Sequence, residues 1–198
     1  MKVRRAYRMS ARATAVEERG QRILAAARAL FVDLPFEEIT LDAVAARAGV
    51  TLQTVLRRFG SKSQLIAAAA KEAMAEVEAQ RGQAAVGNAP VAVTNLFDHY
   101  EEWGDVSLRL LAQEERFEQI GEITRRARAL HAAWVERVFG PELARRGESD
   151  RAVLRAQLIA NCDVYLWKLL RRDLGLSRGQ AERAVLGVIE ALRAAGER

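Results

Sequence analysis

The chain has 198 residues, of which 50% are hydrophobic, 29% are charged and 6% are aromatic. This composition excludes a disordered chain and favours a folded protein rich in helix. Cys162 is the only cysteine, which excludes an intrachain disulfide and makes a reducing cytoplasm the expected compartment.

Basic residues are concentrated in the N-terminal third of the chain. Residues 1–62 contain 12 lysines and arginines but 6 acidic residues, whereas the remainder has a net charge of −1. This asymmetry indicates a polyanionic partner at the N-terminal third. The opening segment, MKVRRAYRMSAR, contains no acid and predicts either a solvated tail or a basic arm that contacts DNA phosphates or a minor groove. It lacks the apolar run of a secretory signal.

Three helices are expected in the first 60 residues. Apolar residues at helical spacing predict the first over residues 16–32. Thr40 is expected to cap a short helix over residues 41–48, and Thr51 a second short helix over residues 52–59.

Helical patterns continue to the C-terminus. Ser61 is expected to cap a longer helix that ends near Gln80. The uncharged stretch between Arg81 and Asp98 contains glycine and proline, so it indicates a loop and not a membrane span. Further helices are expected over residues 90–103, 106–120, 123–139, 149–175 and 177–192. No segment alternates like a strand, so an all-α fold of about nine helices is predicted.

The corner at Gly49 predicts a helix-turn-helix. Two helices joined by a short turn that contains glycine form this motif, and the turn needs a backbone conformation that glycine adopts at no steric cost. Ala45 is small where the two helices would cross, and Val50 and Val55 would fill the angle between them.

The second helix of such a motif lies in the major groove of DNA with its N-terminal end at the bases. Glutamine suits adenine, arginine suits guanine or phosphate, and leucine suits a thymine methyl group. Helix starts at threonine or lysine can hold phosphates. The expected DNA-contacting residues are Thr40, Thr51, Leu52, Gln53, Thr54, Leu56, Arg57, Arg58 and Lys62.

The segment from Ile23 to Ile66 resembles the N-terminal domain of the tetracycline-repressor (TetR) family. The matching positions are Leu30, Phe31, Thr40, Ala45, Ala48, Gly49, Val50, Thr54, Phe59, Ser61, Lys62 and Leu65. The resemblance implies a DNA-binding domain over residues 1–66. It also implies a helical effector-binding and dimerisation domain over residues 67–198.

Three positions depart from the family pattern, the first of which is Arg58, where the family often has histidine. Leu56 stands where the family usually has a tyrosine that contacts a phosphate, and Gln53 stands where glycine is common. Leucine cannot donate a hydrogen bond. We therefore expect Arg57 or Arg58 to supply the missing phosphate contact.

The last two predicted helices carry broad apolar faces that predict a dimer interface. A helix-turn-helix reads few base pairs, so two copies on a palindromic site are expected. Two helices from each chain would form a four-helix contact. The alternative is that these faces close the core of one chain. The residues concerned are Leu154, Leu158, Trp167, Leu170, Val185, Val188, Ile189 and Leu192.

Aromatic residues of the C-terminal part predict a pocket for a small, largely apolar effector. Ordinary core packing is the alternative for each residue taken singly. The pocket candidates are Phe97, Tyr100, Trp103, Phe117, Trp134, Cys162 and Tyr165. His99 and His131 lack any accompanying metal-ligand motif, so neither a metal nor a cofactor is expected.

Three functions are weighed. The first is a dimeric, effector-responsive repressor, released from its operator when the effector binds. The second is an enzyme, which is disfavoured because phosphate-loop, nucleophile and metal motifs are missing. The third is a helical ligand-binding or interaction protein with a vestigial helix-turn-helix, which the leucine at position 56 favours.

Overall fold

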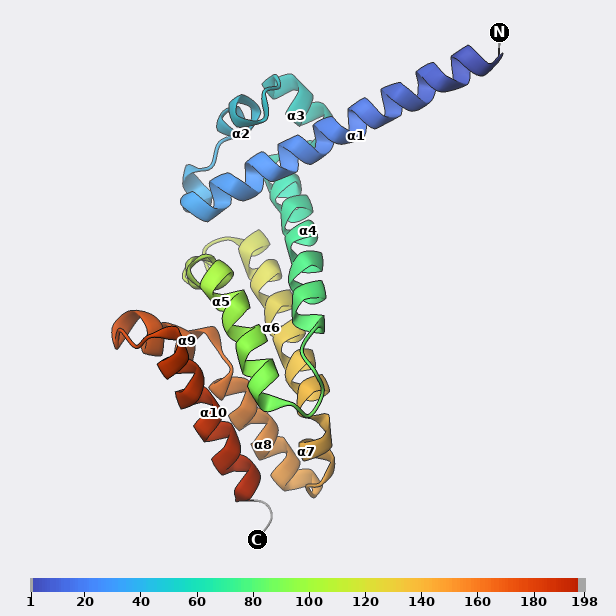
Figure 1. Ribbon diagram of the computed structural model, residues 1–198. Helices are drawn as coiled ribbons and strands as arrows, with labels where there is room; N and C mark the ends of the chain where they lie inside the picture. The colour runs from blue at the N-terminus through green and yellow to red at the C-terminus, as the bar shows by residue number, and fades with distance from the viewer. Residues whose placement is uncertain (1, 196–198) are drawn as a thin grey trace. The chain divides into compact units, whose positions relative to one another are not determined.

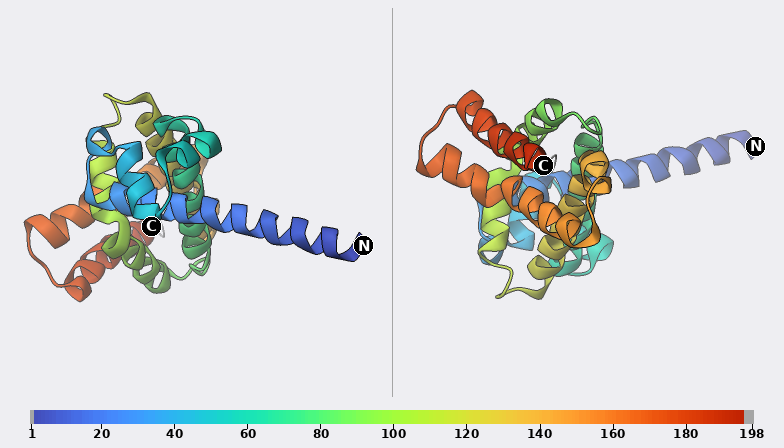
Figure 2. Two further views of the ribbon diagram at one scale, coloured as in Figure 1. Left: turned by 90° about the horizontal axis from the view of Figure 1, so that it is seen from above. Right: turned by 90° about the horizontal axis from the view of Figure 1, so that it is seen from below.

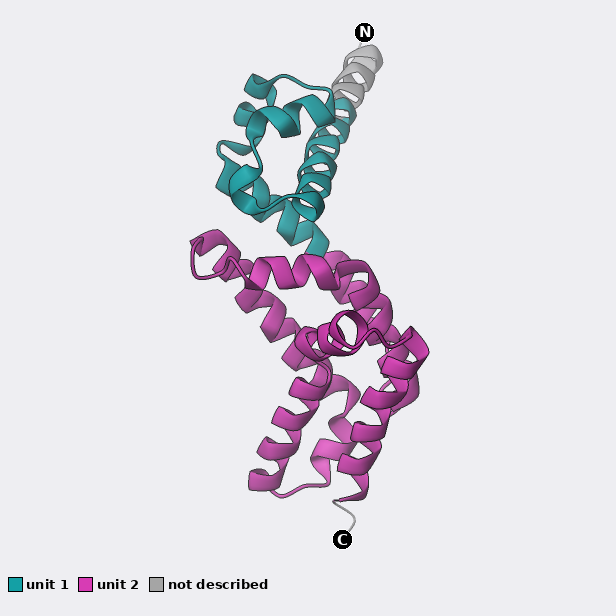
Figure 3. Ribbon diagram, turned by 90° about the vertical axis from the view of Figure 1, so that its left-hand side faces the viewer, with its two compact units in different colours: residues 1–73 teal, residues 74–198 magenta. Residues whose placement is uncertain are grey.

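A computed structural model describes the backbone of residues 2–195 and the side chains of residues 14–195. These residues form helices and no strand, which confirms the all-α prediction. The chain divides into two units, residues 1–73 and 74–198, as Figure 3 shows. This division falls inside a helix, whereas the sequence places the domain boundary after Ile66. No helix in the described residues is long and apolar enough to cross a membrane.

Unit 1 packs three short elements against one long helix. Its elements are α1 (Lys2–Asp33), the 3₁₀ turn η1 (Phe36–Glu38), α2 (Leu41–Ala48), α3 (Leu52–Phe59) and the first part of α4 (Lys62–Gly82). Each α-helix of unit 1 contributes at least one fully buried residue, namely Ile23, Val44, Val55 and Leu65, and Ile39, just after η1, is 1% exposed. Helix α1 begins well before residue 16, where the sequence placed its start, because no glycine or proline interrupts the preceding residues.

The corner between α2 and α3 depends on the backbone conformation of Gly49. This residue has φ 64° and ψ 40°, the left-handed conformation that ends many helices. Its amide N–H and that of Val50 turn back to carbonyl oxygens of α2, which Ala45 and Ala46 supply. The predicted corner is confirmed.

We expect Gly49→Ala to lower the free energy of unfolding of unit 1 by about 1–2 kcal/mol, since a side chain disfavours this conformation. A Cβ atom at Gly49 would meet no heavy atom within 4 Å, so the cost comes from the backbone alone. Urea unfolding of the variant measures this loss. Gly82→Ala is the matched control, because Gly82 also has nothing within 4 Å but lies in a helix without positive φ. Equal losses for the two variants would contradict the conformational argument.

Unit 2 is a bundle of helices around one apolar core. It contains the end of α4, then α5 (Ala89–Leu111), α6 (Glu118–Val138), α7 (Gly140–Ala144), α8 (Glu148–Asn161), α9 (Val164–Lys168), the π-helical turn η2 (Leu169–Asp173) and α10 (Arg178–Ala194). After a turn at Gly175, α10 returns alongside α5 and α8 (Figures 1 and 2). Its N-terminus has the predicted Ser177 cap, completed by the side chain of Gln180.

The predicted helix over residues 106–120 is wrong. Helix α5 continues through Gly104 to Leu111, and α6 begins only at Glu118. Gly104 does not break α5, because a helix tolerates glycine and this one leaves room for a neighbouring ring. A Cβ atom there would lie 2.4 Å from the Trp167 ring.

The predicted long helix over residues 149–175 is also wrong. It begins after Gly147, breaks after Asn161 and restarts as α9 at Val164. The break has a local cause, since a carboxylate oxygen of Asp163 accepts a hydrogen bond of 2.9 Å from the amide of Tyr165. An aspartate in this position caps a new helix.

Candidate functional site

Threonine caps start both helices of the corner, α2 and the candidate recognition helix α3. The hydroxyl oxygen of Thr40 accepts from the amide of Ala43 at 3.1 Å and starts α2. That of Thr51 accepts from the amide of Thr54 at 3.3 Å and starts α3. The hydroxyl groups of Thr51 and Thr54 also bond to each other at 2.9 Å. Both predicted caps are confirmed: Thr40 fixes where α2 begins and Thr51 fixes where α3 begins.

One face of α3 is buried and the opposite face is exposed. Val55 is fully buried and Phe59 is half-buried against unit 1, so α3 is anchored through these residues. Gln53, Arg57 and Arg58 are exposed. The half-buried residues are Leu52, Thr54 and Leu56. Unit 1 therefore presents the amide of Gln53 and the guanidinium of Arg57 outward from an amphipathic helix, as binding in a major groove requires.

Arg57 and Arg58 differ in what holds their side chains. Arg58 donates to a carboxylate oxygen of Glu17 in α1 at 2.8 Å, and its guanidinium lies against Gly20. Bonds from Gln21 and Arg58 lower the pKa of Glu17, which keeps this carboxylate charged at neutral pH. Among the described residues, the side chain of Arg57 makes no ion pair and no hydrogen bond. Its guanidinium is thus the better placed of the two to reach a phosphate or a base.

The ammonium group of Lys62 is engaged inside unit 1. It donates to the carbonyl oxygen of Phe36 and, at 3.4 Å, to that of Glu37, and it lies 4.2 Å from the centre of the Phe36 ring. Partial burial lowers its pKa. Lys62 therefore ties the start of α4 to η1, and its predicted contact with phosphate stays a prediction. The basic arm also stays a prediction, because the side chains of residues 1–13 lie outside the described part.

The predicted pocket residues fall into two groups. Phe97, Tyr100, Trp134 and Cys162 are buried together in the core of unit 2. The hydroxyl group of Tyr100 donates to the carbonyl oxygen of Cys162 at 3.0 Å, and burial raises the pKa of the Cys162 thiol to about 12. The other three residues lie further out, with Trp103 and Phe117 half-buried and Tyr165 59% exposed.

Sequence reasoning missed Arg81, which lies in the last turn of α4 and is only 3% exposed. Its guanidinium stacks 4.0 Å from the centre of the Trp134 ring and bonds to Nδ1 of His131 at 3.2 Å. Nε2 of His131 lies 3.1 Å from the carbonyl oxygen of Ile159. Because that carbonyl can only accept, Nε2 carries the proton and Nδ1 accepts from Arg81. His131 is therefore neutral.

Burial lowers the pKa of both histidines, and for His99 to about 3, with the nearby Arg81 charge as the second cause. In the unfolded chain their pKa is about 6.5. We therefore expect the free energy of unfolding of unit 2 to fall as the pH drops from 7 to 5. In this range the two histidines become protonated in the unfolded chain but stay neutral in the folded chain. Each histidine adds a slope of at most about 1.4 kcal/mol per pH unit.

Urea unfolding at pH 7.5, 6.5 and 5.5 measures this slope. Carboxylates with a lowered pKa, such as Glu101, titrate below this window and do not contribute. His99→Gln should flatten the profile. A midpoint that stays constant over the three pH values would contradict the assignment of neutral histidines.

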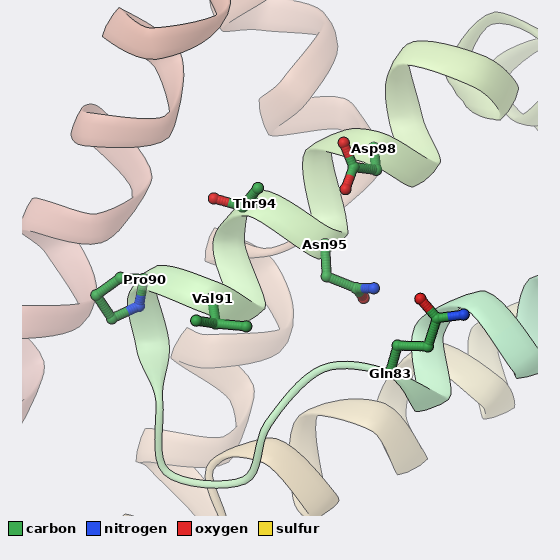
Figure 4. A pocket seen from close by; sticks show the side chains of 6 residues that line it. All are labelled: Gln83, Pro90, Val91, Thr94, Asn95 and Asp98. Carbon is green, nitrogen blue, oxygen red and sulfur yellow. The ribbon is translucent and has the colours of Figure 1, made fainter.

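An open surface groove of about 380 Å³ also lies on unit 2 (Figure 4). It is bordered by the start of α5 and the end of α4, through Gln83, Pro90, Val91, Thr94, Asn95 and Asp98. None of the predicted pocket residues lines it. Most of its lining residues are exposed and none is aromatic, unlike the enclosed aromatic walls of a small-molecule site.

Most of the predicted dimer residues close the core of unit 2. Six of the eight are buried there, whereas Val188 is 46% exposed and Leu192 is half-buried. The predicted faces thus match the alternative in which they pack within one chain. The exposed faces of α8 and α10 share only Val188 with the predicted set. Their small apolar residues are Ala152, Val153, Ala156 and Ala160 on α8 and Ala184, Gly187, Val188 and Ala191 on α10.

Comparison with known proteins finds a family match within unit 1. Residues 23–69 match the family described as bacterial regulatory proteins, tetR family, over its N-terminal domain. A solved structure from Pseudomonas aeruginosa PAO1, described as a candidate transcriptional regulator, is similar with a TM-score of 0.70. The two sequences are 19% identical, and the similarity covers 92% of this chain and 94% of that one. At this identity the similarity shows a shared fold. No curated protein matches the chain.

Proposed function

We propose, on the premise that this chain is a DNA-binding regulator of the tetR family, that it acts as a dimeric repressor. It binds a palindromic operator through α3 and leaves it when a small effector enters unit 2. The observation that carries the proposal is the outward face of α3, with Gln53 and Arg57 exposed on a helix anchored by the buried Val55. Its place of action is the cytoplasm, where the operator lies.

The dimer contact we propose uses the exposed faces of α8 and α10. Both faces consist of small residues spaced three or four apart, which allow helix backbones to approach closely. Neither of these two faces contains a charged side chain, and α8 and α10 contact each other within unit 2. Two such pairs form a four-helix bundle across a two-fold axis.

The effector site we propose is the aromatic core around Tyr100 and Trp134, with Phe97 and Cys162 beside them. The effector must bind the DNA-incompetent state more tightly than the DNA-competent state, or it shifts nothing. A coupling of about 1–3 kcal/mol, which is roughly 5- to 150-fold in operator affinity, makes a useful switch.

Selection of bound duplexes from a random DNA pool tests this function. The expected result is an inverted repeat whose half-site centres lie about 34–36 Å apart or a multiple of that distance. Sedimentation of the protein, free and on the selected DNA, should show a dimer. A pool without enrichment would contradict DNA reading. It would favour the interaction protein, for which the leucine at position 56 and the internal bonds of Lys62 already provide some support.

A further inference from the structure

Arg81 is a buried cation without an anion. Its side chain is almost fully enclosed, and among the described residues no carboxylate pairs with it. Other arginines of unit 2 do have such partners. These pairs are Arg128 with Glu114, Arg171 with Glu101, Arg172 with Asp105, Arg178 with Asp98 and Arg193 with Glu142. A buried charge normally has a counter-charge, so Arg81 is exceptional in this fold.

Two buried N–H donors at Arg81 have no hydrogen-bond acceptor. Nε of Arg81 is buried and has no hydrogen-bond partner, and the same holds for Nε1 of Trp134, whose ring lies 4.0 Å from the guanidinium carbon. Both groups are N–H donors. Two nearby acceptors are already engaged, since Nδ1 of His131 accepts from Arg81 and the carbonyl oxygen of Cys162 accepts from Tyr100, whose hydroxyl group also interacts with Arg81. The cluster therefore combines a positive charge with two unpaired N–H donors, one from Arg81 and one from the Trp134 ring that lies against it.

We propose that this cluster binds the carboxylate of an effector whose remaining body is apolar. A carboxylate matches the planar guanidinium fork and accepts several hydrogen bonds at once. The surrounding walls are apolar and aromatic, from Phe97, Tyr100, Trp134 and Phe139. This inference rests on the proposed function, because it names the chemical class of the effector in unit 2.

A singly charged anion fits the cluster better than a phosphate dianion. Among the residues whose side chains the structure describes, Arg81 is the cation available to this cluster, because the neighbouring Arg137 guanidinium donates to the carbonyl oxygens of Ala84 and Arg81 at 2.8 and 2.9 Å. Desolvation lowers the pKa of Arg81 in the free protein, and a bound anion would stabilise the charged form of the guanidinium. Arg81 belongs to α4, which directly follows α3 in the chain, so the anion acts on the helix that joins the two units.

Thermal unfolding of the full chain with matched probes tests the proposal. The probes are octanoate, phenylacetate and indole-3-acetate, each paired with its uncharged amide. We expect at least one carboxylate to raise the Tm and its amide to leave the Tm unchanged. Arg81→Met should abolish the shift, whereas the control Arg126→Met, at an exposed arginine of α6, should keep it. Without probe, Arg81→Met should unfold no earlier than wild type, since it removes an unpaired buried charge.

Three results would overturn the proposal: equal shifts for an acid and its amide, a shift that persists in Arg81→Met, or no shift with any carboxylate. If Arg81→Met fails to fold, Arg81→Lys replaces it, because lysine keeps the charge but loses the fork. Its Tm shift should then need at least about tenfold more carboxylate. An unaltered response in this variant would also overturn the proposal.

Operator binding in the same samples separates this inference from the proposed function. A selected operator that binds, in a protein with no carboxylate response, overturns the Arg81 site and leaves the regulator intact. A carboxylate that raises the Tm through Arg81 but does not change operator affinity supports the site and contradicts the effector switch.

Discussion

Replacement of Arg57 by alanine is expected to weaken operator binding by about 1–3 kcal/mol if the guanidinium reads a base. If it holds a phosphate instead, the slope of log affinity against log salt should become shallower by about 1. The physical reason is its position, since Arg57 is exposed on the outward face of α3 and has no ion pair among the described residues. Fluorescence anisotropy of a labelled operator over a range of salt concentrations measures both quantities.

Two variants serve as controls for Arg57→Ala. Arg125→Ala removes an equally exposed charge from α6 in unit 2 and should leave operator binding unchanged. Arg58→Ala should have a smaller effect than Arg57→Ala, because Arg58 is engaged with Glu17. If all three variants bind the operator like wild type at every salt concentration, α3 does not contact DNA through these arginines.

Trp167→Ala should destabilise unit 2 by about 3–5 kcal/mol, because it removes a large side chain from the core. Trp167 is 1% exposed, and its Nε1 donates to Glu101 at 3.1 Å. Gly104→Ala should cost about 1–3 kcal/mol, since the added methyl group overpacks the core. Its Cβ would lie 2.4 Å from the Trp167 ring, and a side-chain ring in a packed core cannot move far enough to avoid it.

A double-mutant cycle tests whether these two effects share one cause. In the Trp167→Ala background, Gly104→Ala should become neutral or stabilising, since its methyl group enters the vacated space and alanine favours the helix. The unfolding free energies of wild type, both single variants and the double variant give the coupling. If the two losses of unfolding free energy were additive, the cost of Gly104→Ala would not come from contact with the Trp167 ring.

The helix-turn-helix could be predicted because its signals are local. Thr40, Gly49 and Thr51 each set the backbone next to themselves through a cap or a left-handed turn. The period of apolar residues then identifies the buried side of α3, where Val55 lies. These effects depend only on neighbouring residues and not on distant parts of the chain.

The interior of unit 2 could not be predicted in the same way. The sequence shows that α8 and α10 have apolar faces but not which element covers them, and six of the residues predicted at a dimer interface lie in the core of unit 2. Gly104 and Arg81 acquire their roles only from distant partners, Trp167 and Trp134. An arginine just before a glycine at the end of a helix ordinarily indicates an exposed C-terminal turn, so its burial had no signal in the sequence.

The central claim is that the outward face of α3 reads DNA bases, and Gln53 tests it most directly. Gln53 is exposed in the first turn of α3, the part of a recognition helix that meets the bases. DNA selection from a random pool should be repeated with Gln53→Ala. The account predicts that one position in each half-site loses its base preference while the others keep theirs. An unchanged consensus bound with unchanged affinity would contradict it.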